Sequence, residues 1–170
     1  MILNGLAKSG NHALKKTCAL LGVELQVNHI RYADKVQGEK YLFVARHPKN
    51  VMCSAIRMTR GCATPMGMIN SIPYGVMGSR LNECAEHFAP WLHDADTTVI
   101  RYENELMTPA GVQKVADWLG VPFVDVTAQI PGDTVTWTGR PSDWQLCWND
   151  EVQAVWEANG GLLLEAAYGY

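Results

Sequence analysis

A glycine-containing turn near the start of the chain has the residues to bind an anion. The stretch GLAKSGNHALKK, residues 5–16, joins a short apolar run to a helical pattern. Gly5 and Gly10 let the backbone turn tightly and approach a ligand. The N–H groups at the start of the following helix favour an anion. The turn also carries side chains that can donate hydrogen bonds: Lys8, Ser9, Asn11 and His12. We expect a phosphate-binding loop, with a plain strand-to-helix turn as the alternative.

This loop differs from the loop of nucleoside triphosphatases in the position of its lysine. Lys8 comes before the last glycine, Gly10, whereas the triphosphatase motif places its lysine directly after that glycine. The order therefore argues against a triphosphate as the ligand.

A second stretch, YLFVARHPKNVMCSAIRM at residues 41–58, adds a cation and a hydroxyl. Arg46 ends a continuous apolar run, which is typical of a central parallel strand. Ser54 lies in the helical pattern that follows. A guanidinium at a strand end and a hydroxyl on the next helix can converge on one phosphate. The alternatives are a structural ion pair for Arg46 and a surface position for Ser54.

The elements that must position these residues alternate along the chain. Apolar runs and alternating patterns predict strands over 1–6, 23–29, 40–46 and 97–102. Helical spacing and end signals predict helices over 11–21, 50–60, 75–93, 108–120 and 150–167, with loops over 61–74 and 121–148. Such alternation predicts an α/β fold with a mostly parallel sheet, in which ligands bind at the carboxyl ends of the strands.

Composition narrows the class of protein. The 170 residues fit one domain, 1–170, and the net charge of −3 argues against nucleic acid as a partner. The five cysteines are odd in number and have no CxxC spacing, which favours reduced thiols over disulfides or zinc. No apolar run is long enough to span a membrane, and the start lacks a signal-peptide pattern. We therefore expect a cytoplasmic protein with no membrane partner.

Taken in order, these stretches resemble the sulfotransferases that use 3′-phosphoadenosine 5′-phosphosulfate (PAPS). Residues 7–13 (AKSGNHA) match the 5′-phosphosulfate loop of that family, and residues 45–54 (ARHPKNVMCS) match its 3′-phosphate strand and helix. Residues 101–104 (RYEN) match its Arg-Tyr-Glu-Asp segment. Residues 139–144 (GRPSDW) are similar to its Gly-Asp-Trp segment, and residues 162–170 to its terminal helix.

The resemblance implies a short, single-domain member with a P-loop-type three-layer fold, a central sheet flanked by helices. It implies PAPS as donor, 3′-phosphoadenosine 5′-phosphate (PAP) as product, and no metal. The donor-binding residues that it implies are Lys8, Ser9, Gly10, Asn11, His12, Arg46, Ser54, Tyr102 and Arg140. Lys8 would also stabilise the leaving phosphate, as a catalytic residue. Tyr102 would pack near the adenine, or would fill the core.

His29 is the residue expected to act as the general base. It ends the predicted second strand, on the same edge as Lys8, and the family's catalytic histidine also lies between the two phosphate motifs. Val27 stands where that family has a lysine. The alternative for His29 is a strand-end histidine bonded to a backbone group. Glu24 is a reserve base at the far end of its strand.

The expected function is therefore in-line sulfuryl transfer to a hydroxyl or amine acceptor. A small P-loop nucleotide kinase and a nucleotide-binding relative without transfer activity remain alternatives. The acceptor is left open among small molecules, saccharides and protein hydroxyls. Residues 58–80, rich in methionine and glycine, would form an acceptor lid or a loop packed on the core. A homo-oligomer is a further possibility, because a second subunit could complete the acceptor pocket.

Overall fold

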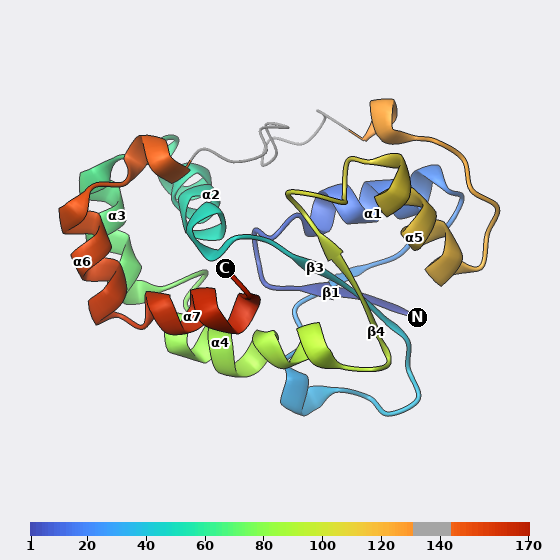
Figure 1. The fold of residues 1–170 in the computed structure, drawn as a ribbon, viewed down its shortest axis with the longest axis horizontal. Coiled ribbons are helices and arrows are strands. Elements are labelled where there is room, and N and C mark those ends of the chain that lie inside the picture. Colours follow the sequence, from blue (N-terminus) through green and yellow to red (C-terminus); the bar gives the residue numbers. More distant parts are fainter. Residues whose placement is uncertain (131–143) are drawn as a thin grey trace.

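The computed structural model describes residues 1–130 and 144–170, which form an α/β fold around one parallel sheet (Figure 1). The strand order is β2-β1-β3-β4. The strands are β1 (Ile2–Gly5), β2 (Val27–Asn28), β3 (Tyr41–Ala45) and β4 (Thr97–Arg101). Gly5 pairs with Val44, and Ala45 pairs with Arg101, so β1, β3 and β4 end at one edge.

The sheet separates two hydrophobic cores. Alternate side chains of β3 point to opposite faces: Leu42 and Val44 belong to one core, and Tyr41 and Phe43 to the other. Helices α1 (Asn11–Leu20) and α5 (Pro109–Leu119) cover the first core. The second core is covered by α2 (Pro48–Arg60), α3 (Pro65–Ser71), α4 (Leu81–Phe88), α6 (Asp150–Ala158) and α7 (Gly161–Tyr168). Figure 1 shows that α2, α3 and α6 extend beyond the carboxyl ends of the strands.

Short 3₁₀ turns join several of these elements. They are η1 (Tyr32–Asp34), η2 (Ile72–Tyr74), η3 (Ala89–His93), η4 (Thr127–Gln129) and η5 (Trp144–Cys147). In the described part of the chain, no helix has both the length and the apolar character needed to cross a membrane.

The end signals of α5 confirm the sequence-based boundaries there. Thr108 Oγ1 accepts a hydrogen bond from the N–H of Gly111 at 3.1 Å, and Pro109 occupies the first turn. Gly120 ends the helix in the left-handed conformation, with φ of 70°. The predicted cap at Asn149 is also confirmed, because its Oδ1 accepts from the N–H of Val152 at 2.9 Å.

The predicted strand over 23–29 is wrong for most of its length. Only Val27 and Asn28 pair with β1. The N–H of Val23 donates instead to the carbonyl of Cys18 at 2.9 Å, closing the end of α1. The alternating pattern therefore reflects a half-buried edge segment.

The predicted loop over 61–74 is also wrong, because it contains α3. Pro65 occupies the first turn of that helix, and Thr64 Oγ1 accepts from the N–H of Gly67 at 3.1 Å. The proline therefore starts a helix here. Met68 is fully buried and anchors α3 on the core.

Two predicted helices are interrupted by left-handed residues. The helix expected over 75–93 begins only at Leu81, because Gly75, Met77 and Gly78 have φ of 68°, 51° and 88°. The last helix divides at Gly160, with φ of 87°. A Cβ on the next residue, Gly161, would lie 2.2 Å from the Trp156 ring, so only glycine fits there.

Candidate active site

The carboxyl ends of β1 and β3 border a cavity of about 190 Å³. Eight of the residues predicted from the sequence line it: Lys8, Gly10, Asn11, His12, His29, Arg46, Ser54 and Tyr102. The described residues that line the cavity include no aspartate or glutamate. Arg140 lies outside the described residues.

The loop before α1 is held in a conformation that requires its glycines. Gly10 has φ of 116°, and a Cβ there would lie 2.4 Å from Cδ2 of Tyr102. A Cβ on Gly5 would lie 2.4 Å from Oδ1 of Asn11. Lys8 itself has a positive φ of 69°, which is uncommon for a residue with a side chain. The loop therefore combines close backbone approach with local strain.

Two side chains of this loop hold the loop itself. Ser9 is fully buried, and its hydroxyl donates to the carbonyl of Leu6 at 2.6 Å. Ser9 does not line the cavity, so the expected contact of its side chain with the donor has no support in this geometry. The amide of Asn11 also donates to Leu6, at 3.0 Å, while its buried Oδ1 has no hydrogen-bond partner.

Arg46 is held at the end of β3 by groups from three directions. Its Nη1 donates to the carbonyl of Lys8 at 3.2 Å. Its Cζ lies 4.2 Å from the centre of the Tyr102 ring. Its Nε lies 4.0 Å from Oε1 of Glu103. Arg46 is only 7% exposed, so this cation is preorganised at the cavity wall.

Glu103 holds the segment that joins Arg46 to the start of α2. Its Oε1 accepts from the backbone N–H of His47 at 2.9 Å and from Asn50 at 3.2 Å. Its Oε2 accepts from the hydroxyl of Tyr170 at 3.0 Å. The carboxylate therefore joins the start of α2 to residues at the far end of the sequence.

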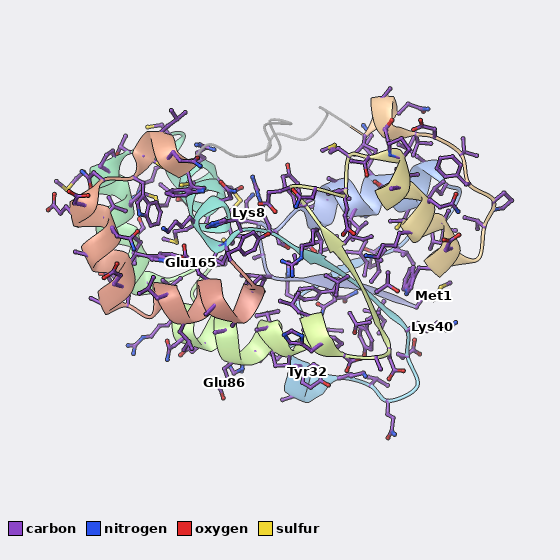
Figure 2. All side chains as sticks on the ribbon, in the orientation of Figure 1. Met1, Lys8, Tyr32, Lys40, Glu86 and Glu165 are labelled. Atoms are coloured by element: carbon purple, nitrogen blue, oxygen red, sulfur yellow. The ribbon has the colours of Figure 1, made fainter. Side chains whose placement is uncertain are left out.

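Lys8 brings a second positive charge to the cavity. Figure 2 shows its side chain beside α2, and its Nζ lies 3.4 Å from Sδ of Met58. Burial, with a smaller contribution from the charge of Arg46, lowers the pKa of Lys8 below its ordinary value. A bound anion would offset the repulsion between these two cations.

His29 is oriented by the backbone of β1. Its Nδ1 lies 2.7 Å from the carbonyl oxygen of Gly5, which can only accept a hydrogen bond. The proton of the neutral ring is therefore on Nδ1, and Nε2 keeps the lone pair. His29 therefore does bond to a backbone group, as the non-catalytic alternative expected. The same bond leaves the lone pair on Nε2, which is the tautomer that a general base requires.

His12 stands in a strongly cationic part of the cavity. Partial burial, followed by the charges of Lys8, Lys15 and His29, lowers its pKa below its ordinary value. No carboxylate contributes to that shift. The neutral ring can donate or accept a hydrogen bond at a ligand.

Apolar side chains line the rest of the cavity: Ala7, Ala13, Val27, Met58 and Met77. Met58 and Met77 are 40% and 57% exposed. Both line the cavity, so part of the segment expected to act as a lid reaches it. Val27 contributes no charge to this part of the cavity.

Tyr102 is 3% exposed, lies among the residues of the first core, and also lines the cavity. It fills core space between Gly10 and Arg46, and the adenine contact remains a prediction. Sequence reasoning missed two supporting roles: that of Glu103 beside Arg46, and that of Asn4, whose side chain bonds to the backbone of Ile30 next to His29. For Asn4 a signal was available, because it is the one polar residue inside the apolar run Met1–Leu6 apart from glycine.

The fold has a counterpart among solved structures. Mouse sulfotransferase SULT7A1, complexed with PAP, matches with a TM-score of 0.67 over 100% of this chain and 88% of that chain, at 15% sequence identity. No protein-family model matches the sequence, and no curated protein matches it either. The chain therefore has the sulfotransferase type of P-loop fold.

Proposed function

We propose that this protein transfers a sulfuryl group from PAPS to a hydroxyl or amine acceptor. The observation that carries the proposal is one cavity in which Lys8, Arg46 and His29 meet without a described carboxylate. Two phosphate groups at opposite ends of one nucleotide need separate cations, and a base must stand at the open side. The fold shared with a sulfotransferase crystallised with PAP supports this reading.

The cavity suits the charge of such a donor. Lys8 and the N–H groups at the start of α1 would hold the 5′ end, where a helix N-terminus favours an anion. Arg46 and Ser54 would hold the 3′-phosphate, with Arg140 as a further expected contact. When bound, the donor supplies an activated sulfuryl group and leaves negative charge on the bridging oxygen.

The residues of the chain then have distinct tasks. Nε2 of His29 accepts the proton of the acceptor hydroxyl as its oxygen attacks sulfur. The ammonium of Lys8 stabilises the charge that develops on the 5′-phosphate as the sulfur–oxygen bond breaks. His12 contributes a hydrogen bond at the phosphosulfate. Positioning and charge stabilisation account for most of the catalysis, as in phosphoryl transfer.

The acceptor side favours a compound with an apolar face. Val27, Met58 and Met77 line the cavity beside His29, and methionine surfaces adapt to varied apolar shapes. We therefore expect phenols and apolar alcohols to be better acceptors than saccharides.

Calorimetric titration tests the donor site. PAP should bind at least about 10-fold more tightly than ATP, since a 3′-phosphate contact is expected to be worth at least about 1.5 kcal/mol. Tighter binding of ATP would favour the kinase alternative and reject the donor assignment.

Transfer of labelled sulfate from PAPS to a panel of phenols and sugars tests the reaction. His29→Asn keeps an amide that can donate to Gly5 but removes the base, so the turnover should fall at least about 100-fold. Lys8→Met should lower turnover similarly, because it removes the charge at the leaving group. His93→Ala, a change at an exposed residue that does not line the cavity, is the control and should leave turnover unchanged. Wild-type protein that binds PAP but transfers nothing would favour the inactive relative.

A further inference from the structure

A buried asparagine lies inside the apolar strand β1. Asn4 is 0% exposed, and a buried amide is costly unless its oxygen and nitrogen both find partners. Both do, and on the same residue: Oδ1 accepts from the N–H of Ile30 at 2.8 Å, and Nδ2 donates to the carbonyl of Ile30 at 3.1 Å.

This side chain continues the pairing of β1 with β2 beyond the end of the backbone ladder. The ladder between the two strands ends where Asn4 pairs with Asn28. Two residues after Asn28, at Ile30, the side-chain amide of Asn4 makes the hydrogen bonds that a neighbouring strand's backbone would otherwise make. Nε1 of Trp91 also donates to the carbonyl of Ile30, at 3.1 Å, so this peptide is fixed from two sides.

His29 lies between the two residues that are held in this way. Asn28 is fixed by the ladder, and Ile30 by the amide of Asn4. The ring of His29 reaches Gly5, the residue directly after Asn4, at 2.7 Å from Nδ1 to the carbonyl oxygen. Both anchors of the histidine therefore come from adjacent residues of β1.

We propose that Asn4 is a positioning residue, which holds the backbone at Ile30 so that His29 bonds to Gly5 and presents Nε2 to the acceptor. The positioning follows from the contacts above, and its catalytic consequence rests on the proposed function. Asn4 touches no substrate, since it lies in the sheet and does not line the cavity.

Asn4→Val is the direct test, because valine suits a buried strand but can make neither bond to Ile30. The N–H of Ile30 then loses its partner, and the segment carrying His29 is free to shift. We expect kcat to fall about 10- to 100-fold, because small displacements of a catalytic group have effects of this order. The KM for PAPS and the Kd for PAP should change less than about twofold, since Lys8 and Arg46 are untouched.

A second readout does not depend on activity. The ¹⁵N chemical shifts of the His29 ring, measured near pH 8, report which nitrogen carries the proton. The wild-type protein should show the proton on Nδ1, and Asn4→Val should show a mixture of the two tautomers. If Asn4→Val does not fold, Asn4→Thr, with a hydroxyl that can replace only one of the two bonds, should show an intermediate mixture.

Thr17→Val is the matched control. Thr17 is also fully buried, and its hydroxyl donates to Ala13 within α1 at 3.0 Å, so this change removes a buried hydrogen bond away from His29. It should leave both kcat and the His29 tautomer unchanged. An equal loss of kcat in Thr17→Val, or an unchanged His29 tautomer in the Asn4 variants, would overturn the proposal. A tautomer change in a protein that transfers no sulfate would support the positioning and reject the proposed function.

Discussion

The guanidinium of Arg46 lies over the ring of Tyr102, with 4.2 Å between Cζ and the ring centre. The same ring backs onto Gly10, where a Cβ would lie 2.4 Å from Cδ2. One aromatic side chain thus packs against both the loop before α1 and the cation at the end of β3. Its packing keeps both groups in place at the edge of the sheet.

Gly10→Ala should therefore disturb more than the backbone. The substitution forces a left-handed alanine and drives its methyl into the Tyr102 ring. Gly22→Ala is the control, because Gly22 also has a positive φ, of 86°, but nothing lies within 4 Å of its Cβ position. We expect the free energy of unfolding of Gly10→Ala to be roughly 1 to 3 kcal/mol lower than that of the control. Urea denaturation measures the free energy of unfolding of both variants. Equal decreases would show that the Tyr102 ring moves aside without loss of stability.

Arg46→Lys should weaken recognition of the 3′-phosphate specifically. Lysine keeps the charge but loses the planar fork that can hold a phosphate with two hydrogen bonds. The Kd for PAP should rise about 10-fold or more, while the Kd for AMP, which lacks the 3′-phosphate, should stay within about twofold. Arg60→Lys, at an exposed position late in α2, should change neither value. Equal weakening of PAP and AMP would instead indicate that Arg46 acts by holding the Lys8 carbonyl.

Binding of PAP should be coupled to protonation of His12. Burial and the nearby charges of Lys8, Lys15 and His29 hold its pKa below the ordinary value of 6.5, so in the pH range around and below 6.5 a smaller fraction of the free ring is protonated than in an ordinary histidine. A bound anion favours the imidazolium and raises that pKa, so the complex takes up a proton and the affinity increases as the pH falls through this window. Titration calorimetry in two buffers of different ionisation enthalpy measures the uptake. The uptake should be smaller in His12→Asn, and an identical uptake in that variant would assign it to another group.

The cysteines should differ widely in reactivity. Cys62 is exposed, whereas burial raises the pKa of Cys18 and of Cys84 to about 12. Because the thiolate is the reactive form, a disulfide reagent such as Ellman's reagent should modify Cys62 at least about 100-fold faster than the buried pair. Cys62→Ser should remove this fast phase, and fast modification that persists in Cys62→Ser would show that the native fold opens readily.

Local rules explain why much of the fold could be predicted. The apolar run of β3 is typical of a buried parallel strand, and Thr108 with Pro109 marks the start of α5 through a cap that depends on neighbouring residues. The same rules failed where tertiary contacts decide. Pro65 starts a helix because Thr64 caps it and Met68 finds a place in the core, which a pattern of glycine and proline does not reveal.

In the candidate site, too, the sequence determined some features and the tertiary structure determined others. The sequence alone placed Lys8 in the loop after the first strand, and Arg46 and His29 at strand ends. Parallel strands bring their carboxyl ends to one edge, so the proximity of the three residues followed from topology. Only the tertiary structure decided how these groups are oriented. The tautomer of His29, the amide of Asn4 on Ile30 and the carboxylate of Glu103 beneath Arg46 all depend on hydrogen bonds between distant parts of the chain. Such bonds are set by distances of a few ångströms in the packed fold, which no local pattern specifies.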